Sequence, residues 1–270
     1  MKHFSGSLIC SLLCLSAAFS RADSLNVLGT ADSFAVLGAS TVTNTGPTVL
    51  SGNLGVAPGS AITGFPPGIV LNGVNHGNDG VAIQAHANAV SGFAALAALP
   101  FTQNLTGQDL GGLLLNPGVY FFSSSAQLTG ALTLDFAGLS NQSFVFQTGS
   151  TLTTASGSVV NVINRSLNDS IYWQVGSSAV LGTGTVFQGT IVVDQSITLT
   201  TGATIGCGNA IALNGAVTLD TNVIGVCGTG KTDGTPGPGT TAQTPEPGTF
   251  GLLATGVLGA AGALRRRWIA

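Results

Sequence analysis

The sequence predicts a mainly β protein built as a solenoid, in which short parallel strands stack coil upon coil, with one long α-helix packed alongside. Three observations predict this fold class. Strand-like segments return at a nearly regular interval, threonine alternates with Ile and Leu inside them, and glycines stand where the chain must turn. A solenoid needs all three, because each coil buries alternate side chains and bends sharply at its corners.

The repeat is clearest near the end of the folded body. Ile197–Gly202 aligns with Val217–Asn222 at an offset of 20, and Cys207 and Cys227 fall at the same offset. One coil earlier, Ala179–Gly184 matches Ile197–Gly202 at an offset of 18, and the phrase GALTLD at 130–135 returns as GAVTLD at 215–220. A β-sandwich has a similar number of strands, but it does not explain a fixed offset that includes the cysteines.

The two cysteines of this repeat are predicted to form a disulfide. Stacked coils lie ~4.8 Å apart, and a disulfide needs Cα atoms roughly 4.4–6.8 Å apart. An exported protein is oxidised, so Cys207–Cys227 is expected to pin the last coil at the end of the solenoid. A metal site has too few ligands nearby, and we expect neither a metal nor a cofactor.

One segment departs from the strand pattern. From Asp79 to Leu99 apolar residues recur at helical spacing, with Asp79 as the N-cap and Pro100 after the last turn. His76 and His86, beside and within this helix, are interpreted as surface or packing residues. The face expected to pack along the solenoid consists of Ile83, Val90, Phe93, Leu96 and Ala97.

The composition excludes several classes of function. Charged residues make up 6% of the 270 residues, hydrophobic residues 44%, and the net charge is −3. Low charge with high apolar content favours a folded chain over disorder. Between Asp23 and Gly230 the only Lys or Arg is Arg165, so no nucleic-acid partner is expected.

The N-terminal residues 1–22 are predicted to be a signal peptide. Lys2 and His3 precede the apolar run Leu8–Phe19, and small residues allow cleavage after Ala22. A buried N-terminal helix is the alternative. The folded body is then expected at residues 23–228.

The C-terminal end is predicted to be a linker followed by a sorting tail. Residues 229–244 are rich in Gly, Pro and Thr, without apolar periodicity. Residues 245–270 contain Pro245, Glu246 and Pro247, the apolar run Phe250–Leu264, and Arg265, Arg266 and Arg267. With its flanks this run is long enough for a transmembrane segment, and the arginines predict a cytoplasmic C-terminus.

These three parts, in this order, resemble the PEP-CTERM sorting tail of Gram-negative bacteria. The resemblance implies processing by an exosortase-type membrane enzyme. It also implies an exported protein at the cell surface or outside the cell, held in the membrane transiently or permanently by its tail.

The body itself resembles the DUF3494 ice-binding (antifreeze) protein family over Leu28–Gly68, the predicted helix, Leu115–Phe122 and Ser170–Asn222. The resemblance implies a right-handed parallel β-helix of triangular cross-section, with the N-terminal segment contributing to the end of the solenoid. It also implies a monomer whose partner is the surface of an ice crystal, to which a flat face adsorbs and so inhibits recrystallisation.

Some members of that family carry a T-[AG]-x-[TN] motif on the binding face. Three segments match it here, Thr45–Thr48, Thr148–Thr151 and Thr201–Thr204, and Thr183 begins a partial match. The repeat offsets also predict two stacked columns, one of Thr183, Thr201 and Thr221 and one of Thr198 and Thr218. The ice-binding candidates are therefore Thr45, Thr48, Thr148, Thr151, Thr183, Thr185, Thr198, Thr201, Thr204, Thr218 and Thr221.

Two other functions were compared with ice binding. An enzyme needs clustered catalytic groups. Here the body has no Glu and eight scattered aspartates, so we expect no catalysis. The alternative that stays open is a surface or exopolysaccharide-matrix adhesion protein on the same scaffold. Asp194 and Asp220 are charges that an ice-binding face would avoid, so the sequence leaves open which face is used.

Overall fold

The computed structural model describes residues 25–166 and 168–227, which form three parallel β-sheets, one α-helix and one short 3-10 helix. The predicted signal peptide, linker, apolar run and sorting tail lie outside these residues. Within them, no helix is both long and apolar enough to cross a membrane. The predicted three-sided parallel β-helix is confirmed.

Each full coil contributes one strand to each sheet, and every strand pairing is parallel. In order of pairing, sheet A consists of β7 (Asn75–Gly77), β4 (Asn53–Val56), β1 (Phe34–Gly38), β22 (Ala210–Ala212), β19 (Thr190–Val193), β16 (Ser170–Val175), β13 (Ser143–Thr148), β10 (Gly118–Phe122) and β8 (Gln103–Asn104). Sheet B consists of β11 (Ala126–Leu128), β14 (Leu152–Thr154), β17 (Ala179–Leu181), β20 (Ile197–Leu199), β23 (Val217–Leu219), β2 (Thr41–Asn44) and β5 (Ala61–Thr63). Sheet C consists of β6 (Ile69–Leu71), β3 (Val49–Ser51), β24 (Val223–Gly225), β21 (Thr204–Ile205), β18 (Val186–Phe187), β15 (Val159–Ile163), β12 (Ala131–Asp135) and β9 (Leu114–Leu115).

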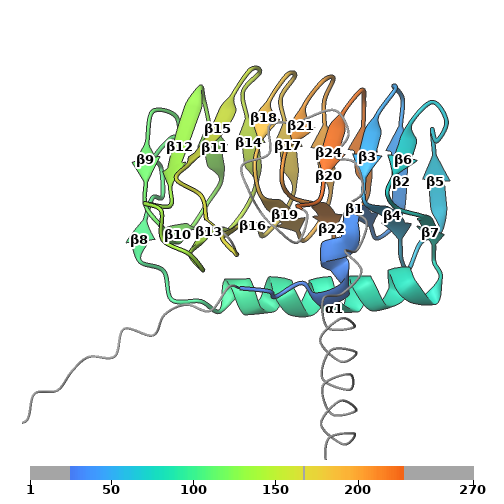
Figure 1. Cartoon of the computed structure of the whole chain (residues 1–270), viewed down its shortest axis with the longest axis horizontal. Helices are drawn as coiled ribbons and strands as arrows, with labels where there is room; N and C mark the ends of the chain where they lie inside the picture. The colour runs from blue at the N-terminus through green and yellow to red at the C-terminus, as the bar shows by residue number, and fades with distance from the viewer. Residues whose placement is uncertain (1–24, 167, 228–270) are drawn as a thin grey trace, which may run out of the picture. The chain divides into compact units, whose positions relative to one another are not determined.

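The first coils of the chain stack on its last coil. Strand β1 pairs with β22, and β3 pairs with β24, so residues from opposite ends of the described chain are neighbours. Figure 1 shows this seam as orange strands beside blue ones. The helix α1 (Gly80–Ala97) then carries the chain along sheet A to the opposite end of the stack, where β8 begins.

The offset between aligned residues of successive coils is not constant. It is 18 from Ala179 to Ile197 (197 − 179) and 20 from Ile197 to Val217 (217 − 197), as predicted. From Leu152 to Ala179, however, it is 27 (179 − 152). The repeated GALTLD phrase proves misleading, because its two copies contribute strands to different sheets, β12 in sheet C and β23 in sheet B.

Aromatic side chains fill the wider coils. Tyr120, Phe146 and Trp173 are aligned neighbours in sheet A, with ring centroids 5.3 Å and 3.9 Å apart. In the narrower coils the same column continues with Ile191 and Ala210. The interior stays filled because side-chain size follows the size of the coil.

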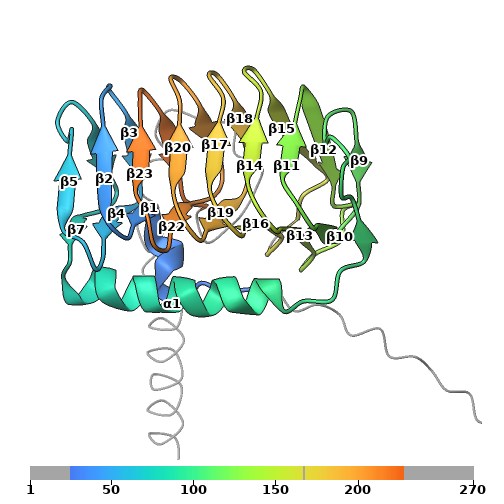
Figure 2. The ribbon, with the colours of Figure 1, turned by 180° about the vertical axis from the view of Figure 1, so that it is seen from behind.

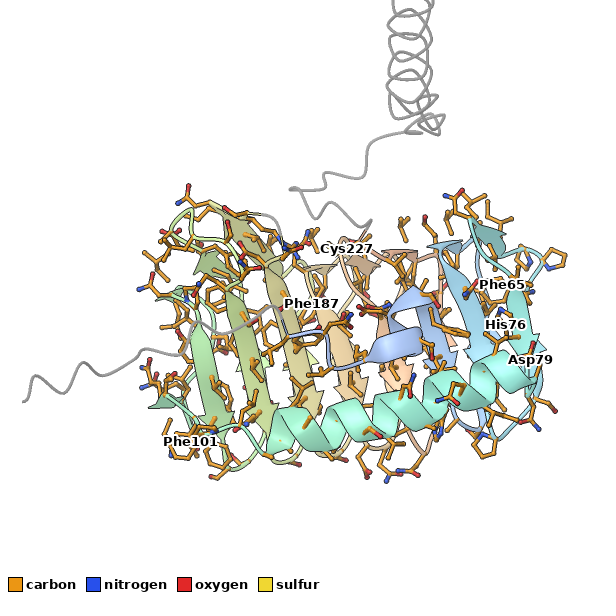
Figure 3. All side chains as sticks on the ribbon, turned by 60° about the horizontal axis from the view of Figure 1, so that its bottom comes forward. Phe65, His76, Asp79, Phe101, Phe187 and Cys227 are labelled. Atoms are coloured by element: carbon orange, nitrogen blue, oxygen red, sulfur yellow. A yellow bond between two sulfur atoms is a disulfide. The ribbon has the colours of Figure 1, made fainter. Side chains whose placement is uncertain are left out.

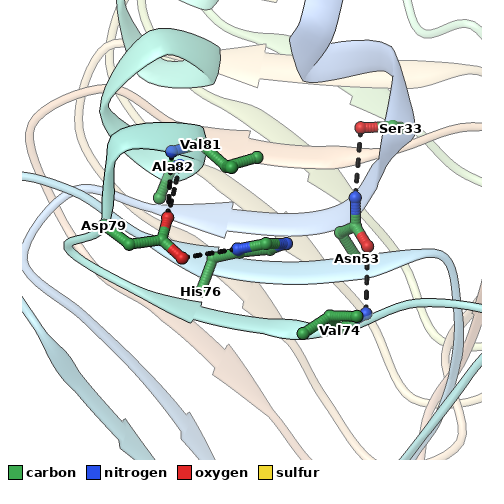
Figure 4. Close-up of polar contacts among 7 residues, drawn as sticks. All are labelled: Ser33, Asn53, Val74, His76, Asp79, Val81 and Ala82. Carbon is green, nitrogen blue, oxygen red and sulfur yellow. Dashed lines mark hydrogen bonds and ion pairs between the residues drawn. The ribbon is translucent and has the colours of Figure 1, made fainter.

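The helix begins where the sequence predicted. Asp79 is its N-cap and accepts hydrogen bonds from the backbone N–H groups of Val81 and Ala82, at 3.1 and 2.9 Å (Figure 4). The Asp79 carboxylate also contacts His76 Nδ1 at 2.7 Å. His86 contacts the Leu213 carbonyl through Nε2 at 2.8 Å, in agreement with its predicted packing role.

The face of α1 that packs on the solenoid differs from the one predicted. Ile83 and Val90 are about half exposed, at 51% and 45%, and Ala97 is exposed as well; of the predicted face, Leu96 is buried and Phe93 partly so. The buried face consists mostly of small residues: Ala82, Ala85, Ala89, Gly92 and Leu96.

Small residues on that face let the helix backbone approach its neighbours closely. A Cβ atom at Gly92 would lie 2.6 Å from the Val27 carbonyl oxygen. Side-chain size, rather than hydrophobicity, therefore determines which face of α1 packs on the solenoid. For this reason the spacing of the apolar residues predicted the wrong face of the helix.

The predicted disulfide is present between Cys207 and Cys227, with Cα atoms 4.8 Å apart. Its expected place at the end of the solenoid is wrong. The last coil lies between the coil of β19–β21 and the first coil of the chain, so the bond secures an internal seam. The repeat offsets revealed the pairing of the cysteines, but they carried no information on the stacking of the N-terminal coils.

Replacing both cysteines with serine should lower the free energy of unfolding by about 3 kcal/mol, because the bond closes a loop of this length in the unfolded chain. The sequence separation is 20 residues. Urea unfolding of residues 23–228 measures the change. Reduced wild-type protein is the matched control and should unfold like the double variant; equal stability of all three proteins contradicts the prediction.

Candidate functional site

Sheets B and C carry the open faces of the solenoid. The outward side chains of sheet A, among them Val145 and Val192, are buried against α1 and the N-terminal segment. Figure 3 shows α1 crossing this face from the side of His76 and Asp79 to the side of Phe101. Of the three sheets, B and C are therefore the ones whose outer faces are open to a surface partner.

A column of β-branched residues runs down the outside of sheet B, whose strands lie side by side in Figure 2. We call it the threonine ladder. In order of pairing it consists of Thr153, Val180, Thr198, Thr218, Thr43 and Thr63. Gln127 precedes Thr153 at the end of the sheet. Parallel strands repeat at ~4.8 Å, so the hydroxyls form a regular row.

The predicted column of Thr198 and Thr218 forms the centre of this ladder. Sequence reasoning missed Thr43, Thr63 and Thr153. Thr43 and Thr63 stand at an offset of 20 (63 − 43) in alternating segments, which was a usable signal. Their pairing with the column of Thr218 had no such signal, because it joins positions that differ by 175 in the chain (218 − 43).

A second column of small residues flanks the ladder. It includes Ser125, Thr151, Ser196, Thr41 and Ala61. Thr151 Oγ1 donates to Ser125 Oγ at 2.8 Å, and Thr41 pairs with Ala61. These residues are no larger than threonine, so they leave the side chains of the threonine ladder accessible on this side.

Three candidate threonines lie inside the solenoid. Thr48, Thr148 and Thr185 are each at most 1% exposed. Thr48 Oγ1 donates to Asn44 Oδ1 at 2.6 Å, and Thr185 Oγ1 lies 2.8 Å from Thr154 Oγ1. These three assignments are corrected: the hydroxyls face the interior and are not available to a surface partner.

Four candidates lie at the corner between sheets B and C: Thr45, Thr183, Thr201 and Thr221, all exposed. The predicted column through Thr221 breaks here. The offset between β20 and β23 is 20 (217 − 197), but that between β21 and β24 is 19 (223 − 204), so the corner of the last coil is shorter by one. Thr221 turns with a φ of 57°, and Thr201 lies beside Asp220 instead.

Thr204 lies on sheet C rather than on the ladder. It pairs with Val186 on one side and Val223 on the other. The motif Thr201–Thr204 thus rounds a corner, and its two threonines belong to different surfaces.

Asp220 is the carboxylate next to the ladder. Hydrogen bonds from Thr201 Oγ1, at 2.5 Å, and then from Thr221 Oγ1, at 3.0 Å, hold the pKa of Asp220 below its usual value. At neutral pH the charge is therefore present, but the two corner threonines solvate it. Asp194 is bonded to Gln195 and Asn214 at the corner between sheets A and B.

This arrangement predicts a loss of stability in acid. Because the pKa of Asp220 is lower in the folded chain than in the unfolded chain, its charge stabilises the fold at any pH above the usual aspartate pKa, near 3.8. This stabilisation is lost as the pH falls from that value through the pKa of the folded state. We expect the Tm of residues 23–228 to be flat from neutral pH down to about 5 and to fall below about 4. Thr201→Val removes the first donor and brings the folded pKa of Asp220 closer to its usual value, so this fall should be smaller than in wild type, and Asp220→Asn, which removes the carboxylate, should make it smaller still. Identical pH profiles for all three proteins would contradict the assignment.

Titratable and metal-ligating side chains are scattered over the described residues. Among them, no three His, Cys, Asp or Glu side chains gather where they could hold a metal. One cavity of about 510 Å³ lies beside the N-terminal segment, lined by Asp32, Tyr172, Asn209 and Cys227 among others. The fold and the ladder define a class of protein: a parallel β-helix that presents a regularly repeating surface.

The chain belongs to the ice-binding-like family, whose model matches residues 36–225. It is 57% identical over 204 residues to an ice-binding protein of Nostoc sp. (strain HG1), covering 76% of this chain and 75% of the relative. Over 73% of this chain it is 31% identical to ice-binding protein 1 of Shewanella frigidimarina, of which the match covers 25%.

Solved structures agree with the fold. The crystal structure of an ice-binding protein from an Antarctic biological consortium matches with a TM-score of 0.70 and 45% identity, covering 74% of this chain and 90% of the other. The ice-binding protein of the Antarctic ascomycete Antarctomyces psychrotrophicus matches with a TM-score of 0.69 and 39% identity, covering 74% and 97%.

Residues 243–267 match the PEP-CTERM protein-sorting motif. The match includes Pro245, Glu246 and Pro247 and the arginines 265–267, and it confirms the predicted motif.

Proposed function

We propose that this protein is an exported antifreeze protein that binds ice through the threonine ladder of sheet B and its flanking column of small residues. The observation that carries the proposal is the register: five threonines and one valine occupy the same position on six neighbouring strands. Family membership supports the same function, because the relatives are ice-binding proteins.

Threonine suits such a surface for two physical reasons. Its hydroxyl hydrogen-bonds to water and its methyl group limits where neighbouring water can lie. Its branched Cβ makes χ1 stiff, so the spacing between rungs stays fixed. Beneath the ladder the alternate residues, such as Ile197, Leu199 and Val217, are buried and hold each strand in place. No catalysis and no cofactor are needed.

The sorting motif supports export and processing by an exosortase-type membrane enzyme. Before processing, the tail is expected to hold the protein in the membrane; afterwards the protein is at the cell surface or outside the cell. Acting as a monomer, it would adsorb to ice and inhibit recrystallisation. The same motif fits an adhesion protein of the exopolysaccharide matrix without affinity for ice, and the experiment below separates the two.

Thr218→Tyr places a bulky ring in the middle of the ladder and should reduce thermal hysteresis and recrystallisation inhibition about tenfold or more, the effect of losing ~1.4 kcal/mol of adsorption free energy. Ile83→Tyr, on the outer face of α1, is the matched control and should keep wild-type activity. Both variants should keep the wild-type Tm.

Two results would oppose the proposal. Wild-type residues 23–228 that leave ice crystals as unshaped discs at high concentration would favour the adhesion protein. Full activity in Thr218→Tyr would remove the ladder from the binding surface.

A further inference from the structure

A second aligned column runs down the outside of sheet C, and we call it the apolar ladder. In order of pairing it consists of Ala131, Val159, Val186, Thr204, Val223, Val49 and Ile69. It therefore spans seven neighbouring strands without a break in register. Five of its seven residues are Val or Ile, and none is charged.

Exposed apolar side chains gather on this sheet. Thirteen large hydrophobic residues are exposed among the described residues, and six of them stand on strands of sheet C: Ile69, Leu71, Leu114, Ile163, Val186 and Val223. Single exposed apolar residues need no explanation, but an aligned set indicates an interaction surface. Val186, Val223 and Ile69 are 43%, 41% and 48% exposed, so their methyl groups meet the solvent.

We propose that the apolar ladder is a second ice-contacting surface, so that the protein adsorbs to ice with two faces that share the corner of Thr183 and Thr201. This inference rests on the proposed function of the threonine ladder. The two ladders have the same rung spacing, because the same coils build both. Their residues are mostly β-branched and stiff at χ1 on both faces.

The chemistry of the apolar ladder fits water better than a protein partner. Methyl groups restrict the orientation of first-shell water without binding it in a geometry of their own. Thr204 adds one hydroxyl near the centre of the row, with Val186 and Val223 as its neighbours.

A protein interface usually concentrates Tyr, Trp, Phe, Met and Arg at its core, and the apolar ladder contains none of these. The next outward column has an exposed leucine at each end, Leu114 and Leu71. The residues between them include Thr133, Asn161, Gly225 and Ser51, which offer little apolar volume to bury. Asp135 also belongs to β12, four residues after Ala131. Because alternate residues face outward, it lies two outward-facing positions away from the apolar ladder.

Two sides of a three-sided coil point in different directions, so a flat crystal plane meets one of them at a time. The inference therefore predicts that different ice planes are bound by different faces. Blocking one face should remove one set of planes and leave the other.

The experiment uses fluorescently labelled residues 23–228 adsorbed to a single-crystal ice hemisphere. We compare wild type, Thr218→Tyr, Val223→Tyr, the double variant and the control Ile83→Tyr. Each single variant should lose a different set of stained planes, the double variant should lose all staining, and the control should match wild type. Circular dichroism melting confirms that every variant is folded.

Val223→Tyr with wild-type planes and wild-type thermal hysteresis would overturn the inference and leave the threonine ladder standing. Wild type that dimerises in sedimentation, with Val223→Tyr monomeric, would also overturn it, since sheet C would then bind a second copy of this chain. Wild type that stains no plane would instead refute the proposed function itself.

Discussion

The register between coils is the constraint on which the rest of this structure depends. Parallel pairing places equivalent residues of successive coils one above another, inside and outside the solenoid alike. Inside, the result is a column that passes from Tyr120 through Phe146 and Trp173 to Ala210. Outside, the same rule turns single threonines into a ladder. An inserted residue within a strand would move every later side chain to the opposite face.

The sequence was sufficient to predict how the coils of residues 179–222 stack, because their repeats are adjacent in the chain. It predicted the pairing of Thr198 with Thr218 and of Cys207 with Cys227, both of which follow from one offset. It did not reach the seam, because β22 and β1 lie near opposite ends of the described chain. The chain begins its coils at β1, in the middle of the stack, and builds them outward to β7 at one end. Helix α1 then runs along sheet A to the other end, where the coils resume at β8 and are built back toward β1.

The motif matches failed for a different reason. A four-residue motif records residue types but not which side of the strand each residue faces. Alternation decides that: Thr153 points outward and Thr154, its neighbour, is buried. For Thr48 and Thr148 the inward side applied, and each interior hydroxyl matched the family pattern as well as a surface one would. Thr185 stands at the variable position of the partial match that begins at Thr183, and it faces inward too. At the corner, a single missing residue moved Thr221 out of the column with Thr183 and Thr201. Corners differ in length from coil to coil, whereas the paired strands of sheet B keep their register, so predictions on strands are the safer ones.

The point where the described chain ends matters for a surface that must meet a crystal. Cys227 follows β24 of sheet C, and its partner Cys207 stands between β21 of sheet C and β22 of sheet A. The disulfide thus marks the corner between sheets C and A, which is the corner that does not border sheet B. A tail attached after Cys227 starts away from the threonine ladder. The disulfide joins Cys227 to the neighbouring coil. A force applied to the chain after Cys227 is therefore transmitted to Cys207 through the disulfide, without first separating residues 208–226 from the stack.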